Sequence, residues 1–164
     1  MKKKTRVILP GSYDPVTVGH LEVIKRAASE YEEVFVVIFI NPKKQYMFSL
    51  EDRLRMLSVA TDGLDNVLVS YSTGYVIDYM REHEIELIVK GYRTEADLPW
   101  EHEQARWNKE HGGYDTVLWR CDESLAHISS TSVREALVSG DTDTAMALLP
   151  SGVYEYIRSR DGLN

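Results

Sequence analysis

The chain has 164 residues, of which 43% are hydrophobic, and a formal net charge of -7 at pH 7. This length is that of one ordinary domain with a sizeable core, so we expect a single domain over residues 1–164. The negative charge argues against nucleic acid as the main partner, because binding to a phosphate backbone requires a basic surface. The single cysteine, Cys121, excludes an internal disulfide framework and a cysteine-rich metal cluster.

The hydrophobic pattern also bears on the compartment. No apolar run reaches the length of a membrane span, and the apolar stretch before Pro10 is too short for a signal peptide. A single cysteine fits a reducing compartment. We therefore expect a cytoplasmic protein that has no membrane segment.

Apolar runs of strand length alternate with helix-length segments along most of the chain. The runs are short, rich in β-branched residues and nearly continuous, which predicts strands buried on both faces of a sheet. We predict strands at 6–9, 34–40, 67–71, 87–90 and 116–120. Helices are predicted at 19–31, 50–61, 75–83 and 99–110, and shorter ones at 132–139, 142–148 and 152–159. This alternation predicts a doubly wound, Rossmann-like α/β fold with a parallel five-stranded sheet and a helical tail over about 132–164.

Two predicted helices have recognisable starts. Ser49 precedes two acidic residues, Glu51 and Asp52, which the dipole of a first helical turn favours. Ser132 and Glu135 have the spacing of a capping box.

The segment 10–20 joins the first strand to the first helix and reads PGSYDPVTVGH. Gly11 allows the backbone to approach a ligand closely, and Ser12 adds a hydroxyl. His20 falls at the helix start, where unpaired N–H groups and the helix dipole favour an anion. A lone glycine or histidine is more often part of an ordinary turn with a solvent-facing side chain. The spacing differs from both the dinucleotide fingerprint and the Walker P-loop.

The same segment resembles the signature of the nucleotidyltransferase superfamily, G-[ST]-F-D-P-x-x-x-G-H. Tyr13 stands in the place of the usual phenylalanine. The resemblance implies that His20 stabilises the transition state and that Ser12, Tyr13 and His20 contact ATP.

The next loop carries two adjacent lysines, Lys43 and Lys44. Paired lysines in a loop are often only solvated, but next to the first turn one of them could reach an anion. The stretch NPKKQYMFSLEDR resembles the corresponding segment of phosphopantetheine adenylyltransferases. That resemblance implies that Lys44 binds the phosphate of the acceptor substrate.

Lys90, Gly91 and Arg93 follow the fourth strand, a set that suits a phosphate ligand although surface charges alone could explain it. The stretch resembles the family block R-G-[LV]-R-x-x-x-D-[FL]-x-x-E. The resemblance implies that Gly91, Arg93 and Glu101 bind the nucleotide and that Lys90 assists the acceptor phosphate. Lys90 replaces the usual arginine and loses its bidentate fork. Leu98, Pro99 and Trp100 also depart from the family pattern.

A run of four hydroxyl residues, 129–132, opens a later helix and by itself predicts a capping sequence. The segment resembles the family block I-S-S-[ST]-x-[VI]-[RK]-E. The resemblance implies ATP contacts from Leu125, Ala126, His127, Ile128, Ser129, Ser130 and Thr131. We expect His127 to pack or to lie beside the adenine, and not to bind a metal, because no second histidine has ligand spacing.

Taken together, the four blocks imply an enzyme of coenzyme A biosynthesis. It would transfer AMP from ATP to 4′-phosphopantetheine and release dephospho-coenzyme A and pyrophosphate. The family match also implies that Val76 lines the pantetheine arm, that the protein is a homohexamer and that coenzyme A inhibits it. No carboxylate pair marks a protein metal site, so Mg²⁺ is expected to arrive bound to the ATP phosphates.

Three alternatives stay open at the level of sequence. A sister enzyme could use another phosphate ester, such as nicotinate mononucleotide. A non-catalytic nucleotide-binding module could share the fold. A helical interaction protein is disfavoured by the strand-like apolar runs.

Overall fold

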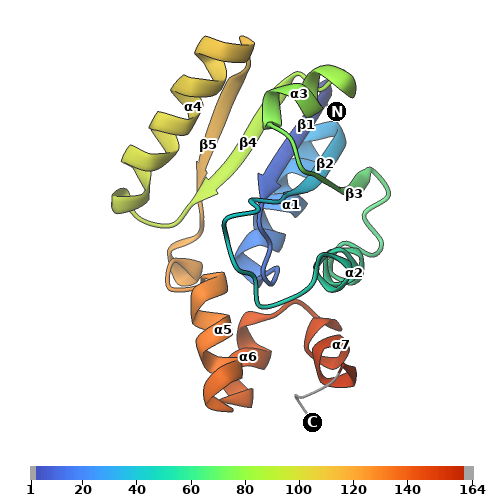
Figure 1. The fold of residues 1–164 in the computed structure, drawn as a ribbon, viewed down its shortest axis with the longest axis vertical. Helices are drawn as coiled ribbons and strands as arrows, with labels where there is room; N and C mark the ends of the chain where they lie inside the picture. Colours follow the sequence, from blue (N-terminus) through green and yellow to red (C-terminus); the bar gives the residue numbers. More distant parts are fainter. Residues whose placement is uncertain (1–2, 161–164) are drawn as a thin grey trace.

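The computed structural model of the protein describes residues 3–160, so residues 161–164 of the predicted tail lie outside it. Five strands form one parallel sheet in the order β3-β2-β1-β4-β5 (Figure 1). Their bounds are β1 Lys3–Gly11, β2 Tyr31–Phe39, β3 Val67–Ser72, β4 Leu87–Tyr92 and β5 Asp115–Arg120. The predicted doubly wound α/β fold with a helical tail is confirmed.

The sheet is covered on both faces because alternate side chains of each strand point to opposite sides. Val7 and Leu9 of β1 belong to a core cluster with α1, α2 and the helices of the tail. Ile8, between them, belongs to a second cluster with Tyr79 and Met80 of α3. This burial explains why the strands read as continuous apolar runs.

All the predicted helices are present, with ends that differ from the prediction by a few residues at most. They are α1 Val18–Glu30, α2 Leu50–Ala60, α3 Val76–Glu82, α4 Leu98–Gly112, α5 Ser130–Ser139, α6 Thr142–Leu148 and α7 Val153–Ser159. Two short 3₁₀ turns occur at Glu95–Asp97 and Glu123–Leu125. None of the helices in the described part of the chain is long and apolar enough to cross a membrane.

One of the two predicted helix starts is correct. The Ser49 hydroxyl accepts the backbone N–H of Asp52 at 3.1 Å, as expected for the cap of α2. The capping box predicted for Ser132 and Glu135 is wrong, because α5 begins at Ser130. Ser129 is the N-cap and exchanges hydrogen bonds with Ser132, which therefore lies inside the first turn.

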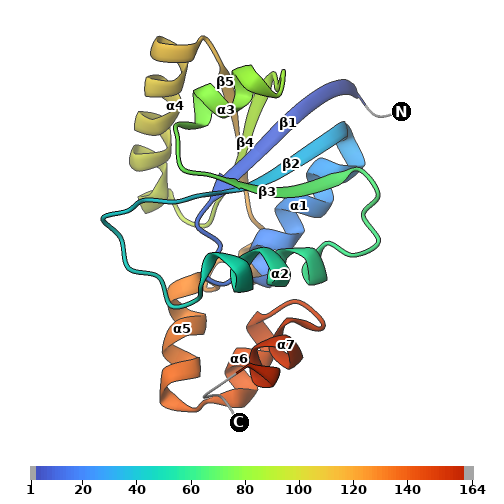
Figure 2. The same ribbon diagram turned by 45° about the vertical axis from the view of Figure 1, so that its right-hand side comes forward.

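The tail helices pack against the end of the sheet where the chain leaves β1. In Figures 1 and 2, α5, α6 and α7 lie together below the sheet. Two side chains of α5 bind the first turn directly. The Ser130 hydroxyl donates to the carbonyl oxygen of Pro15 at 2.8 Å, and Arg134 Nη1 donates to that of Asp14 at 2.9 Å. This contact brings segment 125–131 to the carboxyl ends of β1 and β4, which are neighbours in the sheet.

Candidate active site

A cavity of about 310 Å³ lies at the carboxyl ends of β1 and β4. Ligands in doubly wound sheets bind at such a point, where the strand order reverses. Four separate stretches of chain line it: the first turn, the end of β4 with the start of α4, Cys121 after β5, and the segment before α5. Eleven of the residues singled out from the sequence line this cavity: Gly11, Tyr13, His20, Lys90, Gly91, Arg93, Glu101, Leu125, Ile128, Ser129 and Ser130.

His20 is held by a reciprocal cap at the start of α1. The Thr17 hydroxyl accepts the backbone N–H of His20 at 3.2 Å, and the backbone N–H of Thr17 donates to His20 Nδ1 at 3.0 Å. A backbone amide can only donate, so Nδ1 is the acceptor. In the neutral ring the proton is therefore on Nε2, which makes this nitrogen the available donor.

The surroundings of His20 keep its ring neutral. Burial, and secondly the charge of Arg93, lower the pKa of His20 from 6.5 to about 4. At neutral pH the imidazole therefore offers a hydrogen bond without a positive charge. The positive charge of the cavity comes from the side chains of Lys90 and Arg93.

Tyr13 packs against the ring of His20. Only 6% of Tyr13 is exposed, and its hydroxyl donates to the carbonyl oxygen of Leu9 at 2.9 Å. Its ring meets the His20 ring edge-on, with centroids 4.9 Å apart. A Cβ atom at Gly11 would lie 3.0 Å from the Tyr13 ring, which explains the glycine. Because its hydroxyl is engaged, Tyr13 acts in this structure as a packed support for the histidine.

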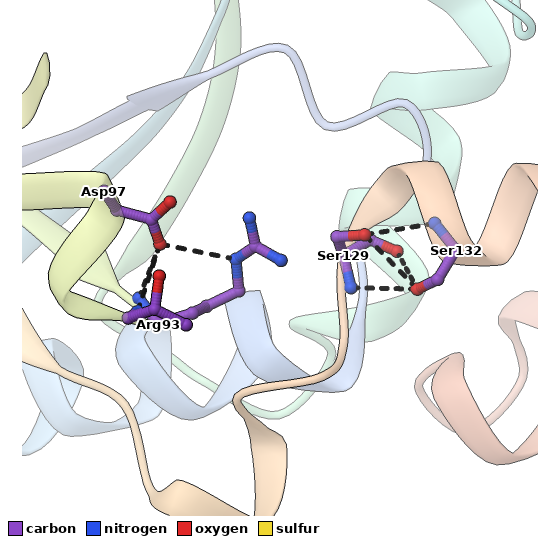
Figure 3. A network of polar contacts seen from close by, with 5 residues as sticks. Arg93, Asp97, Ser129 and Ser132 are labelled. Carbon is purple, nitrogen blue, oxygen red and sulfur yellow. Dashed lines mark hydrogen bonds and ion pairs between the residues drawn. The ribbon is translucent and has the colours of Figure 1, made fainter.

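Arg93 extends across the cavity from the β4–α4 loop toward Ser129 at the start of α5 (Figure 3). Asp97 orients it from behind: Asp97 Oδ2 lies 3.8 Å from Arg93 Nε and accepts the backbone N–H groups of Arg93 and Thr94. The Nε edge of the guanidinium therefore faces Asp97. Its two terminal nitrogens form no recorded side-chain contact within the described part of the chain and remain available to bind an anion.

Lys90 and Glu101 form an ion pair inside the same cavity. The Lys90 Nζ and Glu101 Oε2 atoms are 2.9 Å apart, and only 13% of the Glu101 side chain is exposed. The sequence assigned these residues to different ligands, the acceptor phosphate and the nucleotide. The structure brings them into direct contact.

Lys44 and Ser12 do not line the main cavity but meet beside it. Lys44 Nζ lies 3.5 Å from Ser12 Oγ, and Ser12 lies between two cavity residues, Gly11 and Tyr13. Lys44 also borders a second, more open groove of about 570 Å³ between its own loop and α5. His20, Lys44 and Arg93 thus belong to one rim of the molecule.

Four residues singled out from the sequence lie elsewhere. Val76 packs beside the cluster of Ile8 on the opposite face of the sheet. Ala126, His127 and Thr131 belong to the correct segment but do not line the cavity. His127 is exposed and so does not pack in the core, and the other expected role, a place beside the adenine, stays a prediction.

The cavity residues that were not among the candidates from the sequence include Thr17, Val23, Val89 and Cys121. The spacing of Thr17 and His20 is that of a capping box and could have indicated the contact. No local signal marks the other three, since apolar residues and a cysteine are common in any core.

The described residues contain no group of three or more His, Cys, Asp or Glu side chains placed to hold a metal ion. The carboxylates near the cavity have protein partners. Asp14 accepts two backbone N–H groups, Asp97 accepts two more, and Glu101 pairs with Lys90. This donor set fits a metal that arrives bound to a ligand better than one held by the protein.

Comparison with known proteins agrees with this geometry. A cytidylyltransferase-like family model matches residues 8–136. The phosphopantetheine adenylyltransferase of Thermobifida fusca (strain YX) is 38% identical over 94% of this chain and 93% of its own length. The phosphopantetheine adenylyltransferase of Clostridium novyi (strain NT) is 36% identical over 81% of this chain and 83% of its own length. The chain belongs to the phosphopantetheine adenylyltransferase family.

A solved structure of lower sequence identity has the same fold. The nicotinic acid mononucleotide adenylyltransferase of Plasmodium falciparum superposes with a TM-score of 0.72 over 96% of both chains, at 17% identity. At this identity the likeness concerns the fold alone. The sequence relatives, which cover most of the chain, distinguish this family from other nucleotidyltransferases.

Proposed function

We propose that the protein transfers the adenylyl group of ATP to 4′-phosphopantetheine and releases dephospho-coenzyme A and pyrophosphate. One observation carries the proposal. A cavity with His20 and Arg93 adjoins the Lys44–Ser12 pair, and this arrangement supports two phosphates bound side by side. The family membership supports the choice of acceptor.

The chemistry requires little more than position and charge. A phosphate monoester is already anionic at neutral pH, so no general base is needed. The obstacle is that two polyanions must approach in line with the leaving pyrophosphate. Fixed donors and cations in a confined site lower this barrier. His20 would donate from Nε2 to an oxygen of the α-phosphate, where negative charge increases in the transition state.

ATP and the acceptor would bind to different residues of the same rim. Gly91, Arg93 and Glu101, with segment 125–131 and the first turn, would bind ATP. Ser12 and Lys44 would bind the acceptor phosphate. Lys90 would assist once the acceptor competes with Glu101 for its ammonium group. Val76 as a wall of the pantetheine arm remains a proposal from the family match.

Mg²⁺ would enter with ATP and neutralise charge on its phosphates. The side chains described here would orient those phosphates: Arg93 through its free guanidinium edge and His20 through Nε2. The carboxylates near the cavity have backbone or lysine partners.

The proposal is tested by incubating the protein with labelled ATP and, in parallel, 4′-phosphopantetheine or nicotinate mononucleotide. Dephospho-coenzyme A and pyrophosphate should form in equal amounts with the first acceptor. Adenylylation of nicotinate mononucleotide in its place would favour the sister enzyme. ATP binding without pyrophosphate release from either would favour the non-catalytic module.

We also infer, from family membership, a cytoplasmic homohexamer that coenzyme A inhibits. Exposed aromatic side chains at the start of α3 and on α4 are compatible with self-association: Trp100 is 60% exposed, and the tilted rings of Tyr75 and Trp107 have centroids 5.7 Å apart. Sedimentation velocity of the full chain tests the assembly state. Titration of the reaction with coenzyme A tests the inhibition.

A further inference from the structure

Arg53 of α2 is a buried charged residue that the reaction described above does not use. Only 3% of its surface is exposed. Its Nη1 donates to the carbonyl oxygen of Ser12 at 3.0 Å, and its Nε donates to that of Phe48 at 3.2 Å. Its guanidinium carbon lies 4.0 Å from the centroid of the Tyr46 ring. One side chain thus ties α2 to the first turn and to the loop that carries Lys44.

The recorded partners of Arg53 are all uncharged. Two are carbonyl oxygens and one is an aromatic ring, and no ion pair among the described residues includes it. A guanidinium stays protonated in proteins, so the charge is permanent. A buried charge without a counter-charge is unfavourable, and an anion bound nearby relieves that cost.

The charge of Arg53 lies behind the place where we expect the acceptor phosphate. Ser12 presents its carbonyl oxygen to Arg53 and its hydroxyl to Lys44 Nζ. The two cations therefore approach one residue of the first turn from two sides. Because Arg53 is shielded from water, salt screens its field less than that of the exposed Lys44.

Asp14 holds the lysine loop in this arrangement. Its Oδ2 accepts the backbone N–H of Met47 at 2.8 Å, and its Oδ1 accepts that of Phe48 at 2.9 Å. Only 4% of Asp14 is exposed, and no ion pair among the described residues joins it to Arg53. The otherwise exposed loop is thereby fixed at its C-terminal end, so Lys44 stays beside Ser12.

We propose that Arg53 is a positioning residue for a phosphate monoester bound at Ser12 and Lys44. It fixes the Ser12 backbone against the lysine loop, and its buried positive charge is compensated when the dianion of the acceptor arrives. This inference rests on the proposed transfer to a phosphate ester and deepens it. It assigns acceptor affinity partly to a residue that does not line the cavity.

The test compares Arg53→Met, which removes the charge, with Arg53→Lys, which keeps it. Arg55→Met is the matched control, because Arg55 is an exposed arginine on the same helix. For each variant, steady-state kinetics give KM for 4′-phosphopantetheine and kcat, and calorimetry gives the dissociation constants of ATP and inorganic phosphate. Thermal unfolding checks that each variant is folded. If Arg53→Met does not fold, Arg53→Gln replaces it, because its amide still donates to a carbonyl oxygen.

Arg53→Met should raise KM for the acceptor by at least about tenfold, which is the effect of one unit of phosphate charge about 10 Å away at an effective dielectric constant of about 20, and the second charge of the dianion adds to it. The ATP dissociation constant and kcat should stay near their wild-type values. Arg53→Lys should recover most of the acceptor affinity, and Arg55→Met should behave as wild type.

Three results would overturn the inference. They are an unchanged acceptor KM in Arg53→Met, equal losses in Arg53→Lys and Arg53→Met, or a loss that falls on ATP. The binding of inorganic phosphate separates this inference from the proposed function. If the wild-type protein adenylylates no acceptor, the proposed function fails, while the phosphate dissociation constants of the same variants still decide the role of Arg53.

Discussion

Replacing His20 with glutamine should make the stability of the protein less sensitive to acid. Glutamine keeps an amide near the position of the imidazole but cannot take up a proton. In the folded wild type the pKa of His20 is lowered to about 4, whereas the unfolded chain has the ordinary value of 6.5. Between these pH values the unfolded state binds the extra proton, so protonation favours unfolding.

The size of the effect follows from the two pKa values. Each pKa unit corresponds to about 1.4 kcal/mol, so the contribution of His20 is fully present above about pH 7. It falls by about 2 kcal/mol at pH 5 and by about 3 kcal/mol at pH 4. Below the folded pKa both states are protonated, and no further loss occurs. The sign is that of a group whose pKa is depressed by folding.

The free energy of unfolding in urea is measured for both proteins at pH 7.5 and pH 5. Carboxylates and the other histidines titrate equally in the two proteins, so the difference between them isolates His20. The wild type should lose about 2 kcal/mol more than His20→Gln over this interval. Equal losses in the two proteins would mean that His20 is not held neutral, and its assignment as an uncharged Nε2 donor would be refuted.

Three further substitutions test the remaining parts of the site. His20→Ala should lower kcat by about a hundredfold, because losing one preorganised donor usually has this effect. The affinity for ATP, measured by calorimetry, should stay close to that of the wild type. Unchanged turnover would remove His20 from the mechanism. Lys44→Ala should chiefly raise KM for the phosphate acceptor in the same kinetic assay, and an effect confined to ATP would reverse the two pockets. Gly91→Ala should destabilise the fold by about 1–3 kcal/mol and weaken ATP binding, because its Cβ would lie 2.6 Å from Val23 Cγ2. The double variant with Val23→Ala should recover much of the stability in urea, and a failure to recover would show that the clash is not the cause.

The sequence predicted the elements well because the fold repeats one simple pattern. Each strand is buried on both faces and each helix on one, so the apolar runs are long enough to recognise. The start of α5 was predicted wrongly because four consecutive hydroxyl residues offer several equivalent caps. The hydrogen bond of Ser130 to Pro15, 115 residues away, belongs to the start that the folded chain adopts. No local pattern contains that contact.

The site was only partly predictable because several of its contacts join residues that lie far apart in the sequence. A parallel sheet brings the loops after its strands to one edge, so the sequence could indicate that His20, Lys44 and Arg93 meet there. It could not indicate that Lys90 is paired with Glu101 or that Arg53 has only neutral partners. Ion pairing depends on distances across the fold.

The sequence by itself determined the order of the elements, the edge of the sheet where the loops gather and the kinds of side chain placed there. These follow from periodicity and spacing, which are local properties of the chain. The tertiary structure alone decided the state of those side chains: a neutral His20, an Arg93 oriented by Asp97 and an Arg53 charge without a counter-ion. Burial and electrostatic neighbours set such states, and both come from residues far apart in the sequence.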